Sequence, residues 1–277
     1  MSIKLCIGLL THCNDVENPE RFEILKKSVD SLERLVSPEV YIYVWDNCST
    51  PGVREYLQSK NIFNEMHFSD ENLYDVVAVH KLVQVSEKLG APYVCHLEDD
   101  FLFYDHKFVD ACCEFLDTNK DCGYLRILKY EFDRKHVYDK FMQHPLLDAA
   151  NCQRHFNQIT KESLEWESAG NILDFQFYKN NWHWYNYANI CRREVFKSII
   201  PHEDHEPLQR LEGYMMQKYE DLGLKVGVLD LGVVSHIGQF TEKTSQRIKL
   251  ISQKKQLPTI SYKGVLREIE KHELPAD

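Results

Sequence analysis

The feature that most constrains the fold is an alternation of strand-like and helix-like segments over the first hundred residues. Three apolar runs, at 3–10, 40–45 and 93–97, have the composition of strands, and the first is nearly continuous, as in a strand that is buried on both faces. Apolar stripes with helical spacing lie between them, at 22–36 and 76–89. Strand–helix–strand units of this length predict a parallel sheet with right-handed crossovers.

The second half of the chain is less regular. The elements expected there are helices at 105–118 and about 207–222 and strands at 124–128 and 225–229. The aromatic-rich stretch 130–185 shows no clear period, and we expect it to be irregular. No linker separates two domains, so the pattern favours one domain with two subregions.

Charge and cysteine content exclude several classes of protein. The 277 residues include 33 Lys and Arg against 43 Asp and Glu, a net charge of −10, which argues against nucleic acid as a partner. No run of about 20 apolar residues occurs, so no integral membrane segment is expected. The nine cysteines include no CxxC pair, which argues against zinc or a disulfide framework and favours reduced thiols in a cytoplasmic protein.

Three carboxylates follow directly after the third strand-like run: Glu98, Asp99 and Asp100. Their charge is costly at a sheet edge unless water or a cation balances it. Ligands of parallel sheets bind beyond the carboxyl ends of the strands, and Mg²⁺ and Mn²⁺ prefer carboxylate and phosphate oxygens. The alternative is a solvated acidic turn, but the apolar residues 101–103 directly after the acids argue against it.

Polar residues also follow the first two strand-like runs. They are Thr11, His12 and Asn14 after the first, and Asp46 and Asn47 after the second. Because the carboxyl ends of parallel strands share one edge, all three clusters are expected to lie together.

The acidic triplet resembles the metal-binding DxD motif of GT-A glycosyltransferases, here in an EDD form. The first strand, the helix and a second strand that ends in Asp46 are similar to family 2 glycosyltransferases and their relatives. Residues 70–73 (DENL) resemble the loop before the next helix of that group, although its usual glycine after Asn72 is missing. Residues 234–238 (VSHIG) are similar to the segment that carries a further metal ligand. The match covers residues 3 to about 240.

The resemblance implies a GT-A (Rossmann-like) α/β fold. This is a single domain with a mostly parallel central sheet flanked by helices and a smaller acceptor-side subregion. Its expected bounds are 1–240, with a nucleotide-sugar-binding half at 1–128 and an acceptor-binding half at 129–240. Residues 241–277 are polar and are expected to form a tail or arm.

The resemblance also implies an activity. It is a metal-dependent hexosyl- or pentosyltransferase, with inversion favoured, that moves a sugar from a nucleoside-diphosphate sugar, UDP-type favoured, to a hydroxyl of a carbohydrate or glycan acceptor. Asp100 and His236 would ligate Mn²⁺ or Mg²⁺, which neutralises the departing diphosphate. The residues implied to bind the nucleotide sugar are Thr11, His12, Asp46, Asn72, Glu98 and Asp99.

An inverting transferase needs a base for the proton of the acceptor hydroxyl. Glu212 is our candidate, because its spacing from Leu208, Met215 and Tyr219 places it beside a buried helical stripe. A solvated helix acid is the competing interpretation. Asp204 and Glu206, in the run HEDHE, are alternative bases, since the glycine–Glu–Asp signature of the family is not intact.

Two other functions stay open. A sugar-1-phosphate nucleotidyltransferase shares a layered α/β core, but the loop after the first strand (LLTHCNDVENPE) lacks the Gly-rich, Arg-containing sequence of that class. A non-catalytic carbohydrate-binding protein on the same fold is the second alternative, and Asp100 and His236 argue against it.

Overall fold

The computed structural model describes residues 2–105, 107–127, 167–181, 188–201, 211–230 and 233–237. Its strands are β1 (Leu5–Thr11), β2 (Val40–Asn47), β3 (Glu65–Ser69), β4 (Tyr93–Glu98), β5 (Phe101–Phe103), β6 (Cys122–Arg126), β7 (Glu167–Ile172), β8 (Phe175–Asn180), β9 (Asn189–Arg192), β10 (Lys225–Leu229) and β11 (Val234–His236). Its helices are α1 (Pro19–Leu32), α2 (Pro51–Gln58), α3 (Tyr74–Leu89), α4 (Phe108–Thr118), α7 (Arg193–Ile199) and α8 (Leu211–Asp221), with a 3₁₀ turn η1 (Glu33–Leu35). All these elements belong to one compact unit, Met1–Lys129 with Glu167–Gly238.

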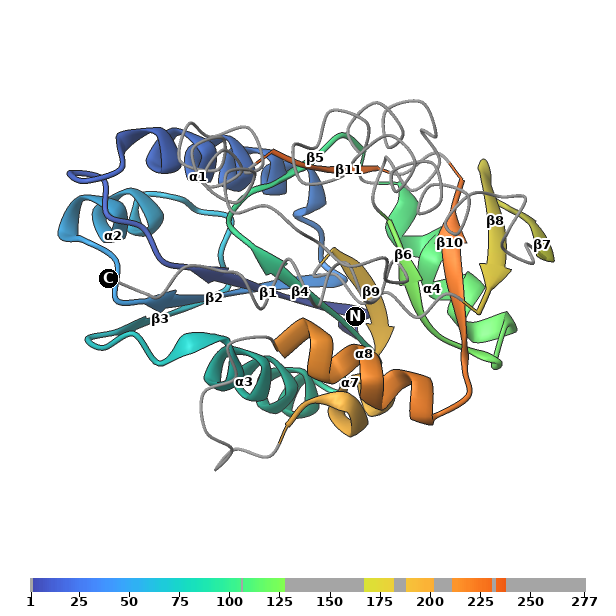
Figure 1. Cartoon of the computed structure of the whole chain (residues 1–277). Coiled ribbons are helices and arrows are strands. Elements are labelled where there is room, and N and C mark those ends of the chain that lie inside the picture. Colours follow the sequence, from blue (N-terminus) through green and yellow to red (C-terminus); the bar gives the residue numbers. More distant parts are fainter. Residues whose placement is uncertain are drawn as a thin grey trace, which may run out of the picture. The chain divides into compact units, whose positions relative to one another are not determined.

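A nine-stranded sheet with the order β3-β2-β1-β4-β9-β6-β10-β8-β7 lies at the centre (Figure 1). β3, β2, β1 and β4 are parallel to one another. β9 is antiparallel to both β4 and β6, so β6 and the parallel β10 run in the direction of β4. β8 is antiparallel to β10, and β7 is antiparallel to β8, so β7 again runs in the direction of β4. Of the strands in this sheet, only β8 and β9 therefore run in the opposite direction. The predicted α/β fold with a mostly parallel central sheet is therefore confirmed.

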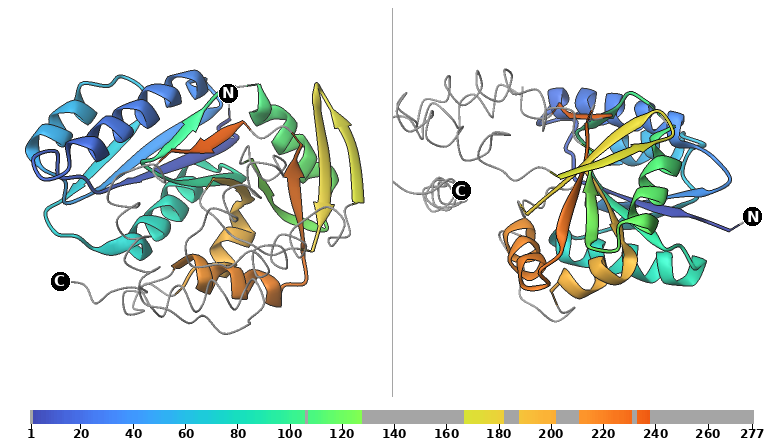
Figure 2. Two further views of the ribbon diagram at one scale, coloured as in Figure 1. Left: turned by 45° about the horizontal axis from the view of Figure 1, so that its top comes forward. Right: turned by 90° about the vertical axis from the view of Figure 1, so that its right-hand side faces the viewer.

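Helices cover both faces of the sheet. α1 and α2 lie on one face, and α3, α7 and α8 lie on the other (Figures 1 and 2). The alternation of side chains along β1 follows this arrangement, since Leu5, Ile7 and Leu9 belong to the core cluster of α1, α2 and α4. Gly8 faces α3 instead, where an added Cβ would lie 3.0 Å from a methyl carbon of Leu82. The close approach of α3 to β1 thus depends on this glycine.

Local sequence signals set the ends of the helices near the strand edge. α1 begins with Pro19, and the side chain of its N-cap residue Asn18 accepts a hydrogen bond from the Arg21 N–H at 3.2 Å. α3 ends at Gly90, which has a φ of 68°. The cap at Asn18 thus begins α1 directly after the loop that follows β1.

The second half differs from the sequence prediction in several places. Within 130–185 the expectation of irregular structure is wrong for 167–180, where β7 and β8 form an antiparallel pair. β9 and α7 were not predicted, because β9 has four residues and its place depends on pairing with β4 and β6. The strand expected at 124–128 is observed as β6, two residues earlier. The predicted tail at 241–277 lies outside the described residues.

Two further observations concern the described residues alone. None of their helices combines the length and the apolar content needed to cross a membrane. Their cysteines are free thiols, and all but Cys48 are buried.

Candidate functional site

The carboxyl ends of three neighbouring strands bring the predicted polar clusters to one edge of the sheet. Thr11 of β1 is paired in register with Asp46 of β2. On the other side of β1, Leu10 is paired with Glu98 of β4. The parallel register therefore places the ends of β1, β2 and β4 side by side, as the sequence predicted.

Glu98, Asp99 and Asp100, which we call the acidic corner, follow β4 at this edge. Asp99 and Asp100 are 1% and 4% exposed. The Thr11 hydroxyl donates a hydrogen bond of 2.6 Å to Oδ2 of Asp99. Arg21 of α1 contacts both acids with one guanidinium: its Nη1 lies 2.8 Å from Oδ2 of Asp100, and its Nη2 contacts Oδ1 of Asp99. A helix that follows β1 thus supplies the cation for acids that follow β4.

The electrostatics of the acidic corner reflect burial together with this ion pair. Burial raises the pKa of Asp99, and the Arg21 charge and the Thr11 hydroxyl oppose that rise. Burial lowers the pKa of Arg21, but the charges of Asp99 and Asp100 outweigh this effect and raise it. The corner is therefore a buried group of carboxylates that requires a cation beside it.

The segment of His236 reaches the acidic corner through a second, small sheet. β11 pairs antiparallel with β5, so that His236 lies opposite Phe101. The N–H of Ile237 donates a hydrogen bond of 2.8 Å to the carbonyl of Asp100. The backbone of His236 is thus beside that of the acidic corner, while its side chain is outside the described atoms.

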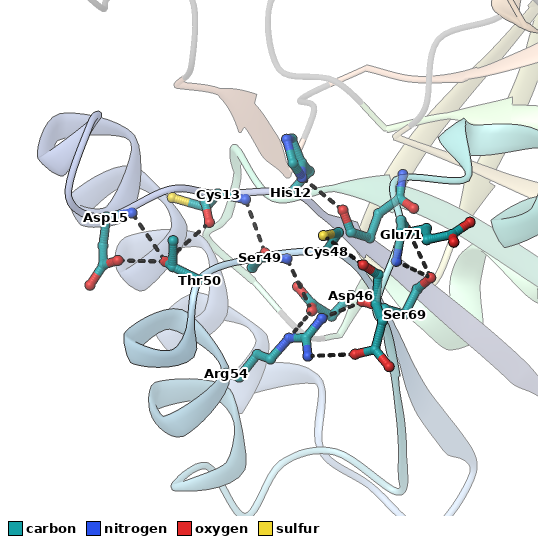
Figure 3. A network of polar contacts seen from close by, with 12 residues as sticks. His12, Cys13, Asp15, Asp46, Cys48, Ser49, Thr50, Arg54, Ser69 and Glu71 are labelled. Carbon is teal, nitrogen blue, oxygen red and sulfur yellow. Dashed lines mark hydrogen bonds and ion pairs between the residues drawn. The ribbon is translucent and has the colours of Figure 1, made fainter.

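A second ion pair lies at the end of β2. Asp46 has no solvent exposure, and its Oδ2 accepts hydrogen bonds from Nε of Arg54 at 2.8 Å and from the Ser49 N–H at 3.2 Å (Figure 3). Among the described atoms, the other carboxylate oxygen of Asp46 has no hydrogen-bond partner. Arg54 also reaches Asp70 and the Ser69 carbonyl after β3, and so joins α2 to both strands.

The loops after β1 and β2 are joined by further hydrogen bonds, drawn in Figure 3. The Cys13 N–H donates to the hydroxyl of Ser49 at 3.0 Å. The Thr50 N–H donates to the Cys13 carbonyl at 3.1 Å, and its hydroxyl donates to Asp15. The loop after β2 turns at Cys48, which has a φ of 71°. These contacts give the strand ends a fixed arrangement.

The exposed side of this edge carries His12 and Asn72. Nδ1 of His12 donates a hydrogen bond of 2.7 Å to the Asn47 carbonyl, which assigns the ring proton to Nδ1. Nδ2 of Asn47 lies 2.7 Å from Oδ1 of Asn72, and Oδ1 of Asn47 accepts from the Leu73 N–H. Asn47 thus connects the loop after β3 to the end of β2.

The structure brings together the residues predicted to bind a nucleotide sugar, whereas the side chains of the predicted bases are not among the described atoms. Thr11, His12, Asp46, Asn72 and the acidic corner lie at the ends of neighbouring strands. Glu212 is in the first turn of α8, and its side chain is outside the described atoms. Asp204 and Glu206 lie outside the described residues altogether.

Sequence reasoning missed Arg21 and Arg54, which hold the buried acids. A signal for them exists. Both arginines lie in the first turn of a helix that follows a predicted polar loop, where the helix dipole disfavours a positive charge. An arginine at that position indicates a nearby carboxylate, which for Arg54 is Asp46 of the preceding strand and for Arg21 follows β4.

The fold resembles solved structures of glycosyltransferases at low sequence identity. TarS 1-349 of S. aureus matches with a TM-score of 0.54 and 15% identity over 93% of this chain and 67% of that one. Its complex with UDP-GlcNAc gives 0.52 and 14% over 90% and 65%. The mannosyltransferase PcManGT from Pyrobaculum calidifontis, in complex with GDP-Man and Mn²⁺, gives 0.54 and 12% over 90% and 61%.

The chain spans about two thirds or less of the length of these structures. Neither a protein-family model nor a curated protein sequence matches it. At such identities the likeness establishes the fold, which is the fold that the sequence predicted.

Proposed function

We propose that the protein is a metal-dependent glycosyltransferase. It transfers a hexosyl or pentosyl group from a nucleoside-diphosphate sugar, UDP-type favoured, to a hydroxyl of a carbohydrate or glycan acceptor, with inversion. In this proposal residues 1–128 bind the donor and residues 129–240 bind the acceptor.

One observation carries the proposal: two buried, adjacent carboxylates end a parallel strand, and the backbone of His236 lies beside them. Buried carboxylates at a ligand-binding sheet edge are costly unless they serve a cation or a reaction. The proteins that share the fold include one in complex with UDP-GlcNAc and one in complex with GDP-Man and Mn²⁺. These two complexes support a nucleotide sugar as the donor of this protein.

The residues at the acidic corner have the chemistry that a divalent cation needs. Carboxylate oxygens are hard ligands, and a His236 imidazole would add a nitrogen, a set that suits Mn²⁺ better than Mg²⁺. Among the described side chains, no group of three His, Cys, Asp or Glu is already assembled as a metal centre. The proposal therefore assigns the cation to Asp100 and to His236, whose side chain is outside that set.

The remaining donor-side residues have supporting roles in the proposal. Thr11 holds Asp99 through its hydroxyl. Asp99 and Glu98 contact the ribose or a water molecule in the outer coordination shell of the metal. Asp46, with one carboxylate oxygen unpaired among the described atoms, accepts a hydrogen bond from the nucleobase of the donor. His12 and Asn72 line the exposed side of the nucleotide site.

The reaction is a displacement at the anomeric carbon. The acceptor oxygen forms a bond to that carbon as the bond to the diphosphate oxygen breaks, and the electron pair leaves with the diphosphate. Asp100 and His236 would hold a divalent cation, which would supply positive charge beside this leaving group. The carboxylate of Glu212 takes the proton of the acceptor hydroxyl, with Asp204 and Glu206 as the alternative bases.

The decisive experiment is a screen of UDP- and GDP-sugars for Mn²⁺-stimulated release of nucleoside diphosphate. Asp100→Ala should reduce release at least about a hundredfold with the fold intact. The matched control is Asp110→Ala on α4, whose side chain is 60% exposed. Release by Asp100→Ala at the parental rate would show that the metal assignment is wrong.

The same assay separates the alternatives. A nucleotidyltransferase would instead release pyrophosphate from a nucleoside triphosphate and a sugar 1-phosphate. A non-catalytic protein would bind a nucleotide sugar or a glycan and turn over neither.

Glu212→Gln tests the base. Because a neutral amide cannot take a proton, kcat should fall by about a hundredfold or more while donor affinity measured by calorimetry stays the same. Unchanged turnover would move the role to Asp204 or Glu206.

A further inference from the structure

Arg21 occupies the acidic corner with a positive charge from within the protein. Its side chain is 26% exposed, and its guanidinium contacts Asp99 and Asp100 at the same time. The proposed function assigns Asp100 to a divalent cation, so two cations have the same carboxylate as a partner.

We infer that Arg21 is an internal counter-ion of the acidic corner that competes with the divalent cation for Asp100 and so sets the affinity of the site for metal. This inference rests on the proposed function, since it takes Asp100 as a metal ligand.

The geometry lets Arg21 release one acid and keep the other. Its Nη1 bonds to Asp100 at 2.8 Å, whereas its Nη2 bonds to Asp99. Asp99 is held from its other oxygen by Thr11 at 2.6 Å. Exchange of Arg21 for a metal at Asp100 therefore breaks one hydrogen bond and leaves Asp99 anchored.

Charge gives the direction of the effect. A guanidinium a few ångströms from a bound dication repels it, and it also partly neutralises the acids that attract the metal. At an effective dielectric constant of about 20, one such charge changes a binding constant by more than about tenfold. Removal of the Arg21 charge should therefore tighten the binding of Mn²⁺.

A purely structural role predicts the opposite result. If Arg21 only maintains the fold of the acidic corner, its loss would disorder Asp100 and weaken metal binding. The sign of the change in affinity separates the two roles, whereas a loss of activity would not.

The experiment measures Mn²⁺ affinity of the metal-free full chain by calorimetry and by the electron paramagnetic resonance signal of free Mn²⁺. The variants are Arg21→Gln, Asp100→Asn and the control Lys27→Gln, which removes the same charge from an exposed position of the same helix. We expect the dissociation constant to fall more than about tenfold in Arg21→Gln, to change less than about twofold in Lys27→Gln, and to rise strongly in Asp100→Asn.

Arg21→Gln leaves buried acids without their cation and is expected to be less stable without metal. Arg21→Lys serves as a second variant, because it keeps the charge but loses the fork that contacts two carboxylates. It should bind Mn²⁺ with an affinity between those of the parent and Arg21→Gln. Circular dichroism establishes that each variant is folded before titration.

The outcomes separate this inference from the proposed function. If the parent binds Mn²⁺ through Asp100 and neither Arg21 variant binds it more tightly, the counter-ion role is wrong and the metal site stands. If neither the parent nor any Arg21 variant binds Mn²⁺ while UDP or GDP still binds, the metal dependence fails and the inference fails with it.

Discussion

The two halves of the central sheet differ in the burial of the carboxylates that form their ion pairs. In the parallel half (β3, β2, β1 and β4), buried carboxylates lie at the strand ends and pair with arginines of α1 and α2. In the mixed half (β9, β6, β10, β8 and β7), the ion pairs lie at the outer strands, where Asp121 and Glu167 are about half exposed. The interior of the mixed half contains aromatic pairs, Phe115 with Phe177 and Tyr124 with Tyr219, together with the buried Arg126 of β6.

The difference teaches that loss of a cation leaves a buried carboxylate without its partner in the parallel half and an exposed one in the mixed half. A buried ion pair contributes little net stability, yet removal of one partner is costly because it leaves a buried charge unpaired. Exposed pairs can be removed at small cost. The two halves should therefore respond differently to the loss of one cation.

The largest expected effect is that of Arg54→Met in the parallel half. Asp46 is fully buried beside Arg54, so this change should lower the free energy of unfolding by about 3 kcal/mol. Urea denaturation followed by circular dichroism measures it. The matched change in the mixed half is Lys225→Met, whose side chain is 35% exposed and which should cost less than about 1 kcal/mol. Equal losses in the two variants would remove the contrast between the halves.

The same contrast explains what the sequence could predict. β1, β2 and β4 are continuous apolar runs joined by local crossovers, so periodicity and length were sufficient to predict them. Asp46, Asp99 and Asp100 could be placed because they follow those runs directly. β9 could not, since its four residues carry little pattern and gain their position from β4 and β6.

The pairing of Arg21 with the acidic corner could not be predicted from the sequence for a related reason. Arg21 is 78 residues from Asp99 along the chain, and no local period connects them. Only the topology, in which α1 follows β1 and β1 pairs with β4, brings them together.

A second effect, of intermediate size, tests the packing of the mixed half. In Gly123→Ala the new Cβ would lie 2.7 Å from a ring carbon of Tyr219. This ring cannot move freely, because its hydroxyl accepts from the Gly123 N–H and donates to the Lys225 carbonyl. The change should cost about 2 kcal/mol in the free energy of unfolding, measured by urea denaturation.

Tyr219→Leu provides the control for that prediction. Added to Gly123→Ala, it should recover part of the lost stability, whereas in the parent it should cost stability by itself. Additive losses in the double variant would show that Tyr219 is not the source of the strain.

The smallest effect concerns His96, which lies where the two halves meet, opposite Gly8 of β1 and Asn189 of β9. Burial lowers the pKa of His96 to about 3, well below the value of about 6.5 in an unfolded chain. Between these two pKa values the unfolded state binds a proton that the folded state does not. The contribution of neutral His96 to stability is therefore fully present above about pH 6.5 and is lost progressively as the pH falls below it. From pH 7.5 to 5.5 the free energy of unfolding should drop by about 1.4 kcal/mol through this group.

His96→Gln isolates that contribution, because other acid-sensitive groups are common to both proteins. Urea denaturation at pH 7.5, 6.5 and 5.5 should give a steeper loss for the parent than for the variant, whatever the difference at pH 7.5. Hydrogen exchange should place the extra acid-induced opening in β4 and β9, where the halves join. Parallel pH curves for the two proteins would mean that His96 is solvated or charged in the folded state, and that the junction is not the acid-sensitive part of the sheet.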